Sequence, residues 1–282
     1  MDAMTLDATP SVAAESPPST IYGPVRSWRV GMSLGVDLLF TSSFCSFRCI
    51  YCQLGKIEHP TLERRVYVPT ERVMADLAAS DWRSADIVTL SGSGEPTLAA
   101  NLAEVIDGIH ALTGKPVMVL TNSTTLGDPA VRRDLLQADK VFCKLDAPND
   151  RLLHVIDRPV EGVTVESIVE GILAFKAEYR GYLAIQMMFM PFNQQEVAEF
   201  AALLNRIQPD EVQLNTPTRP VPREWFRDAR GNHDGAPYPT VPIRHLDHTQ
   251  AAAIEAELRR LTGLKIVSVF KPEAAGGARE HD

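Results

Sequence analysis

The sequence predicts an α/β fold in which a parallel sheet curls into an open, partial (β/α)6 barrel with an irregular C-terminal extension. Short apolar runs rich in Val, Ile, Leu and Phe alternate with amphipathic helical stretches, as in a parallel sheet with right-handed crossovers. Several runs are apolar at every position, which is typical of strands covered by helices. Six or seven such units are too few for a closed eight-stranded barrel.

The predicted strands are apolar runs of four to nine residues bounded by turn residues. They cover seven segments: Gly35–Phe40, Asp86–Leu90, Val117–Leu120, Lys140–Leu145, Tyr182–Met190, Glu211–Asn215 and Leu264–Phe270.

Helices are predicted between these strands. Thr70 is expected to cap the first helix. Apolar residues at helical spacing from Leu102 to Ile109 predict the second, with Gly114 as its stop. Asp128 followed by proline marks a helix start, and Asn193 with Glu196 resembles a capping box. Two further helices are predicted around Ile168–Phe175 and over Thr249–Leu261.

Three of the four cysteines lie within eight residues, in a C-x3-C-x2-C run formed by Cys45, Cys49 and Cys52. Three thiolates at this spacing can bind three irons of a four-iron cluster and leave the fourth iron open to a small molecule. A structural zinc site normally needs a fourth ligand, usually from a second cysteine pair, and a redox dithiol would leave Cys45 unused. The cluster interpretation is favoured, and zinc is the main alternative.

Polar motifs follow the predicted strands, where chemistry gathers in parallel α/β folds. In chain order they are the cysteine run, Ser91–Thr97, Thr121–Ser123, Asp146, Asn193 and Asn215. Their common position predicts one site at one rim of the barrel.

The cysteine run, with Tyr51 before its third cysteine, resembles the signature of the radical S-adenosylmethionine (SAM) superfamily, over roughly Gly23 to Asn215. A partial (β/α)6 barrel is the fold that this resemblance implies. Within the superfamily, four segments look like those of proteins related to the wyosine tRNA-base synthases: Gly23–Val25, Ser33–Asp37, Tyr51–Gly55 and Gln213–Thr218.

The resemblance implies that Cys45, Cys49 and Cys52 ligate a [4Fe-4S] cluster and that SAM chelates its open iron. It implies reductive cleavage of SAM to a 5′-deoxyadenosyl radical, which abstracts hydrogen from a substrate. An external one-electron donor of the flavodoxin or ferredoxin type is then required. The alternatives within this chemistry are wyosine-type tRNA-base modification and activation of a glycyl-radical enzyme. The alternative of another class is a zinc-stabilised binding module without catalysis.

The resemblance also suggests cofactor-binding residues. Ser93-Gly94-Glu95 matches a Gly-Gly-Glu strand end, with Gly94 allowing close approach and Glu95 accepting a hydrogen bond from the SAM ammonium group. Tyr51 would stack near the adenine, or pack beside the cluster. Three consecutive residues either contact ligand or close a turn: Thr121, Asn122 and Ser123. Three others are expected to line the cofactor cavity: Asn193, Gln213 and Asn215.

Lys144 and Asp146 share one face of the fourth predicted strand. They are the candidate catalytic residues: inward, they could bind ribose, the methionine carboxylate or substrate, and Lys144 could form a Schiff base. The alternative is that Lys144 and Asp146 have no catalytic role and form a buried ion pair or lie exposed to solvent at the rim of the barrel. Cys143 has the opposite parity and is expected in the core.

A net charge of −8 disfavours an RNA substrate, although a local groove can be basic on an acidic protein. No apolar stretch is long enough to cross a membrane, and residues 1–20 lack a signal pattern, so a cytoplasmic location is expected. The predicted organisation is a disordered lead (1–20), the barrel (21–215), an extension with a long loop, a helix and a strand (216–271), and a disordered tail (272–282).

Overall fold

The structure is a computed structural model that describes residues 18–230 and 236–269. The predicted lead over 1–20 therefore lies outside the described residues except for 18–20, and the predicted tail over 272–282 lies wholly outside them. Phe270, the last residue of the final predicted strand, also falls outside.

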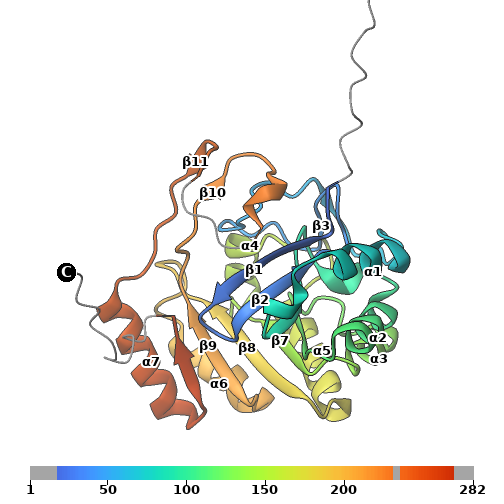
Figure 1. Ribbon diagram of the computed structural model, residues 1–282. Coiled ribbons are helices and arrows are strands. Elements are labelled where there is room, and N and C mark those ends of the chain that lie inside the picture. The colour runs from blue at the N-terminus through green and yellow to red at the C-terminus, as the bar shows by residue number, and fades with distance from the viewer. Residues whose placement is uncertain (1–17, 231–235, 270–282) are drawn as a thin grey trace, which may run out of the picture.

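One eight-stranded sheet forms the centre of the molecule, in the order β1-β2-β5-β6-β7-β8-β9-β12 (Figure 1). Only β1 runs antiparallel to its neighbour, and every other pair is parallel. The strands are β1 (Ile21–Ser27), β2 (Gly31–Val36), β5 (Ile87–Leu90), β6 (Val117–Thr121), β7 (Lys140–Lys144), β8 (Tyr182–Met188), β9 (Glu211–Asn215) and β12 (Ile266–Ser268). The predicted open, partial barrel is confirmed.

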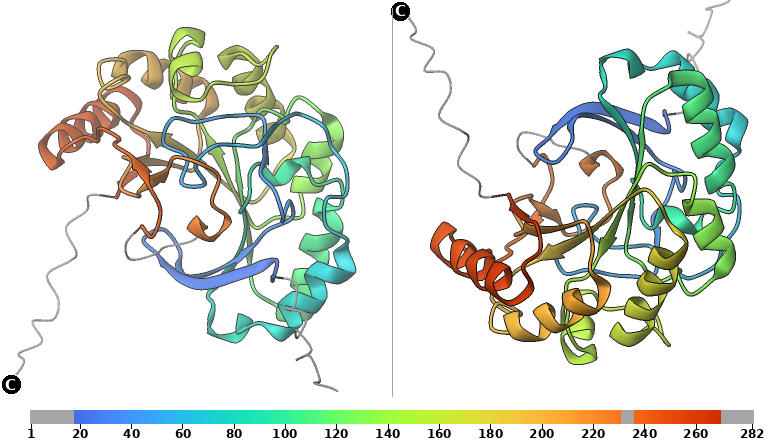
Figure 2. Two further views of the ribbon diagram at one scale, coloured as in Figure 1. Left: turned by 90° about the horizontal axis from the view of Figure 1, so that it is seen from above. Right: turned by 90° about the horizontal axis from the view of Figure 1, so that it is seen from below.

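Helices cover the outer, convex side of the curved sheet (Figure 2). They are α1 (Thr70–Ala79), α2 (Leu102–Thr113), α3 (Pro129–Leu135), α4 (Asp150–Ile156), α5 (Val165–Glu178), α6 (Val197–Ile207) and α7 (His248–Thr262). Four short strands lie outside the main sheet: β3 (Phe44–Cys45), β4 (His59–Pro60), β10 (Val221–Pro222) and β11 (Thr240–Val241). Labels β3, β10 and β11 fall at the same end of the barrel in Figure 1.

The apolar residues form two separate clusters on the two faces of the sheet. The larger lies between the strands and the outer helices and includes Leu34, Val88, Val119, Val141 and Ile185. The smaller fills the concave side with Ile87, Met118, Phe142 and Ala184. Since side chains alternate along each strand, Lys144, Gln186 and Asn215 share the concave face with this inner cluster and lie nearer to the carboxyl ends of their strands.

Local hydrogen bonds explain where the first predicted strand is wrong. It was expected over Gly35–Phe40, but β2 ends at Val36 because the Asp37 carboxylate accepts hydrogen bonds from the backbone N–H groups of Leu39 (3.0 Å) and Phe40 (3.1 Å). Such a side-chain turn competes with the ladder of a sheet. Strand β1 was not predicted.

Two of the predicted helix caps are wrong and two predicted helix boundaries are confirmed. Thr70 donates to Glu104 (2.9 Å) and is the first helical residue rather than the cap. Glu196, not Asn193, is the N-cap of α6. Asp128 does cap α3, accepting a hydrogen bond from Ala130 N–H (2.8 Å), and Gly114 ends α2 with a left-handed backbone (φ 62°).

The C-terminal extension contributes to the main sheet. Strand β12 pairs in parallel with β9, so β9 is not an edge strand. The long loop (residues 216–247) contains the antiparallel pair β10–β11. The division of the chain at residue 215 remains a prediction.

Candidate active site

The cysteine loop (residues 45–52) is fixed at both ends by backbone hydrogen bonds. At its start, Phe44 N–H donates to Ser93 O (3.0 Å) and Glu95 N–H donates to Phe44 O (3.0 Å). Further along, Arg48 N–H donates to Asp157 O (2.8 Å) and Ile50 N–H to Ile156 O (2.9 Å). The loop is therefore attached to the segment after β5 on one side and to the end of α4 on the other.

Gly94 is the point at which the loop and the barrel rim approach most closely. Its φ is +148°, and a Cβ atom there would lie 1.7 Å from Phe44 O. No side chain fits this contact, so the glycine that the sequence predicted for close approach is required by the neighbouring backbone.

Substituting Gly94→Ala should lower the free energy of unfolding by about 3 kcal/mol or more, because backbone strain adds to the clash with Phe44. Urea unfolding would measure the loss. The matched control is Gly114→Ala, where φ is +62° but nothing lies within 4 Å of the added carbon; it should lose about 1–2 kcal/mol, from φ strain alone. Equal losses would contradict the argument from contact.

The three thiols of the loop are free and partly buried, and Cys143 is fully buried in the core, as predicted. Cys45 Sγ accepts hydrogen bonds from Phe47 N–H (3.4 Å) and Asn122 Nδ2 (3.5 Å). Burial raises the pKa of Cys45 to about 12 and also raises the pKa values of Cys49 and Cys52.

The donor set can be tested against the two metal centres that the sequence left open. Within residues 18–230 and 236–269, no three or more His, Cys, Asp or Glu side chains are grouped so that they could hold one metal ion. A tetrahedral zinc site needs such a group. In a four-iron cluster each thiolate binds a different iron, so the sulfurs stand apart. Three thiols on one short loop fit that cluster better than zinc.

Glu95 is buried at the centre of a hydrogen-bond network that includes two of the predicted neighbours. Its Oε1 accepts from Thr97 N–H (3.1 Å), Thr97 Oγ1 (2.6 Å) and Thr121 Oγ1 (2.8 Å), whereas Oε2 accepts from Asn122 N–H (2.6 Å). Burial raises the pKa of Glu95. Asn122 Nδ2 also donates to Ser46 (2.8 Å), so this network reaches the cysteine loop.

Lys144 and Asp146 form an ion pair at the end of β7, with Lys144 Nζ 2.5 Å from Asp146 Oδ2. Lys144 also pairs with Asp157, and Tyr51 OH donates to Asp146. Burial favours the neutral amine, but the two carboxylates outweigh it and raise the pKa of Lys144. Burial raises the pKa of Asp157 to about 6. Tyr51 thus lies against this ion pair, with Lys144 Nζ 5.4 Å from the centre of its ring.

The side chains of the remaining predicted site residues make hydrogen bonds within the protein, except for the buried hydroxyl of Ser123, which has no hydrogen-bond partner among the described residues. Asn193 is buried and uses its amide fully, donating to Asp146 O (2.8 Å) and Met188 O (2.9 Å) and accepting from Met190 N–H (2.8 Å). Gln213 accepts from Arg29 (2.9 Å) and donates to Glu211 (2.7 Å). Asn215 accepts from Thr216 N–H (2.9 Å). Ser123 is buried and has a left-handed backbone (φ 71°).

Sequence reasoning missed Asp37 as a component of the rim. Its Oδ2 accepts from Ser93 N–H (3.0 Å), Ser93 Oγ (2.6 Å) and Arg230 Nη1 (2.7 Å). Arg230 lies in the long loop, 193 residues away, and both side chains are buried. Asp157, which pairs with Lys144, was also missed. No spacing in the sequence marks either residue.

The barrel is open, and it carries three thiols and a buried carboxylate network at the carboxyl ends of its strands. This combination defines a class of enzymes that depend on an iron–sulfur cluster. The sequence profile of the Radical SAM superfamily matches residues 39–204. The chain belongs to this superfamily, and the protein is an enzyme.

Several proteins resemble the chain over most of its length. It is 44% identical over 244 residues to the UPF0026 protein slr1464 of Synechocystis sp., a match that covers 86% of this chain and 92% of the relative. It is 30% identical over 213 residues to the UPF0026 protein MJ1312 of Methanocaldococcus jannaschii, covering 73% and 66% respectively.

Two solved structures share the fold. A radical SAM methyltransferase from Sphaerobacter thermophilus aligns with a TM-score of 0.61 at 16% identity, over 84% of this chain and 65% of that one. Streptococcus suis SuiB bound to S-adenosylmethionine aligns with a TM-score of 0.58 at 12% identity, over 82% and 49%. Among the residues that the structure describes, no helix is both long and apolar enough to cross a lipid bilayer.

Proposed function

We propose that the protein is a radical SAM enzyme whose [4Fe-4S] cluster is held by Cys45, Cys49 and Cys52. The observation that carries this proposal is the attachment of one three-thiol loop to the Glu95 network at the barrel rim. When bound, the cluster and SAM supply a 5′-deoxyadenosyl radical for hydrogen abstraction.

Glu95 is the proposed partner of the SAM ammonium group. Its Oε1 already accepts three hydrogen bonds, but Oε2 accepts only one, from Asn122. A carboxylate oxygen can accept a second, so Oε2 is the atom available to a cationic ligand. The backbone and hydroxyl donors fix its direction before the ligand arrives.

The Lys144–Asp146–Asp157 group is proposed to line the site next to Cys49. Because Lys144 is held between two carboxylates, it supplies a fixed positive charge rather than the neutral amine that a Schiff base needs. Asn193 Nδ2 donates a hydrogen bond to the backbone carbonyl of Asp146 and so helps to hold this residue in place. Tyr51, Thr121, Ser123, Gln213 and Asn215 stay candidate contacts of SAM or of substrate.

The partners proposed with this activity are SAM and a one-electron donor of the flavodoxin or ferredoxin type, in the cytoplasm. A second candidate is tRNA-base modification of the wyosine type, which the resemblance of Tyr51–Gly55 and Gln213–Thr218 to that group favours.

Anaerobic reconstitution with iron and sulfide tests the proposal. The protein should bind about four irons per chain and turn brown, and reduction in the presence of SAM should yield 5′-deoxyadenosine. Removing the iron with a chelator should abolish this product, and zinc should not restore it. A colourless protein that binds one zinc and leaves SAM intact would reject the proposed function.

A further inference from the structure

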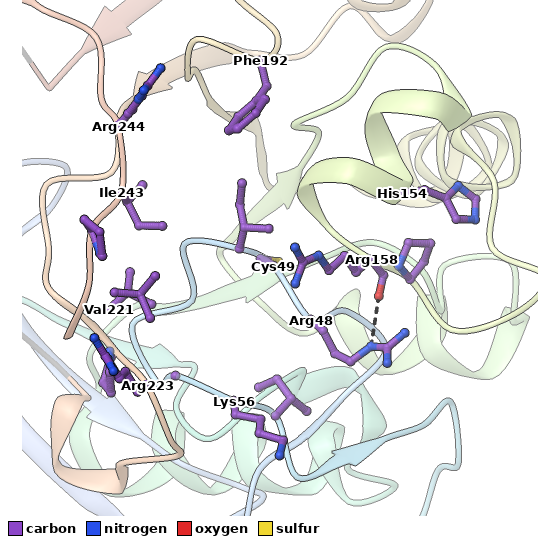
Figure 3. A pocket seen from close by; sticks show the side chains of 17 residues that line it. Arg48, Cys49, Lys56, His154, Arg158, Phe192, Val221, Arg223, Ile243 and Arg244 are labelled. Carbon is purple, nitrogen blue, oxygen red and sulfur yellow. Dashed lines mark hydrogen bonds between the residues drawn. The ribbon is translucent and has the colours of Figure 1, made fainter. Parts of the chain in front are cut away.

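A large cleft opens beside the cysteine loop. Its volume is about 860 Å³, and it lies between that loop, the end of α4 and the long loop that carries β10 and β11 (Figure 3). Cys49 contributes to its wall. Its size is within the range of about 300–1,000 Å³ that is usual for small-molecule sites.

Five exposed cationic side chains surround this cleft, and among the residues that the structure describes no aspartate or glutamate lines it. They are Arg48, Lys56, Arg158, Arg223 and Arg244. Within the described chain none of the five is paired with a carboxylate, although the whole chain carries a net charge of −8. Like charges repel, so this group lacks a compensating anion.

Backbone carbonyls hold the side chains of two of these arginines in place. Arg48 Nε donates to Arg158 O (3.4 Å) and Arg223 Nε donates to Thr240 O (3.3 Å). These bonds leave the two Nη groups of each guanidinium for a ligand. Arg158 directly follows the C-cap of α4 and has the left-handed backbone (φ 48°) of a helix end, where its N–H donates to Leu153 O (3.0 Å).

The cleft also has an apolar wall, which simple anion sites do not need. Phe192 is 53% exposed and Val241 is 40% exposed. Ile50, Val221 and Ile243 also line the cleft, and Figure 3 shows Phe192, Ile243 and Val221 along one side. A flat apolar group can stack on an aromatic ring while phosphates contact the surrounding cations. A nucleotide combines these two chemistries in one molecule.

We propose that this cleft binds a nucleotide, with its base against the apolar wall and its phosphate groups on the cationic rim. The phosphates come either from a free nucleoside triphosphate or from single-stranded RNA. Binding itself does not depend on the proposed function. The further statement that the bound nucleotide is the substrate does rest on the proposed function, because it requires the proposed cluster, one ligand of which, Cys49, lines the cleft.

The test compares the cluster-loaded wild type with the double variant Arg223→Gln/Arg244→Gln, under anaerobic conditions. The probes are GTP, inorganic tripolyphosphate and a fluorescent oligouridine. Wild type should bind GTP or oligouridine more tightly than tripolyphosphate. The double variant should bind about tenfold more weakly, and the salt dependence of RNA binding should fall by about 0.7 for each phosphate that the variant no longer neutralises. GTP alone identifies a free nucleotide, and oligouridine alone identifies RNA.

The matched control is Arg133→Gln, an exposed arginine on α3 outside the cleft. It should bind as wild type does. Equal affinity of wild type and the cleft variant, or equal affinity for tripolyphosphate and GTP, would overturn the nucleotide site. An acidic flavodoxin is added as a fourth probe; binding of flavodoxin alone would also overturn the nucleotide site and would make the cleft a protein-docking surface. Formation of 5′-deoxyadenosine is measured separately, so failure of the cleft proposal is distinguishable from failure of the proposed function.

Discussion

Replacing Cys49 with serine should remove bound iron and SAM cleavage together. A serine hydroxyl does not ionise at neutral pH and is a poor ligand for iron, so two thiolates would remain for a cluster that needs three. Iron content, visible absorption and 5′-deoxyadenosine formation after anaerobic reconstitution measure the effect. We expect product formation at the level of a control without enzyme. The same holds for Cys45 and Cys52.

The control for this experiment is Cys143→Ala. Cys143 is the fourth cysteine, lies on β7 outside the C-x3-C-x2-C run and is fully buried in the core. This variant should keep its iron and its activity. Turnover that persisted in Cys49→Ser, or iron that was lost equally from Cys143→Ala, would show that the ligand assignment is wrong.

Replacing Lys144 with methionine should lower the free energy of unfolding by about 3–5 kcal/mol, because it leaves two buried carboxylates without their cation. Asp146 and Asp157 have side chains only 1% exposed, so water cannot compensate for the missing ammonium group. Adding Asp157→Asn removes one of the two charges and should recover part of the loss. Urea unfolding of the single and double variants measures both effects.

Lys140→Met is the matched control for this substitution. Lys140 lies on the same strand and the same face, but its ammonium group lies 5.4 Å from the centre of the Tyr182 ring rather than against a carboxylate. Its replacement should change stability by about 0.5 kcal/mol or less. A similar small loss in Lys144→Met would mean that the ion pair contributes little and that Lys144 is free for another role.

Several features that depend on neighbouring residues were predicted correctly from the sequence. The strand over Glu211–Asn215 has the predicted bounds, and α2 ends at Gly114 as expected. The grouping of Glu95, Thr121 and Asn122 also followed from their positions after successive strands, because parallel strands end at one rim.

Features that depend on distant contacts could not be predicted. The Asp37 side chain is directed by Ser93 and by Arg230, which no local pattern connects with it. Asn193 looked like a helix cap, yet its amide joins the ends of β7 and β8. In both cases a polar side chain makes tertiary hydrogen bonds in addition to local ones, and only the local ones follow from neighbouring residues.

The pairing of β12 with β9 and the Asp37–Arg230 contact have a consequence for cooperativity. Both join the chain after residue 215 to the barrel, so neither region can unfold without leaving a strand edge unpaired or a buried charge without its partner. The barrel and its extension should therefore unfold together in one transition in scanning calorimetry. A fragment that stops at Asn215 would be prone to self-association.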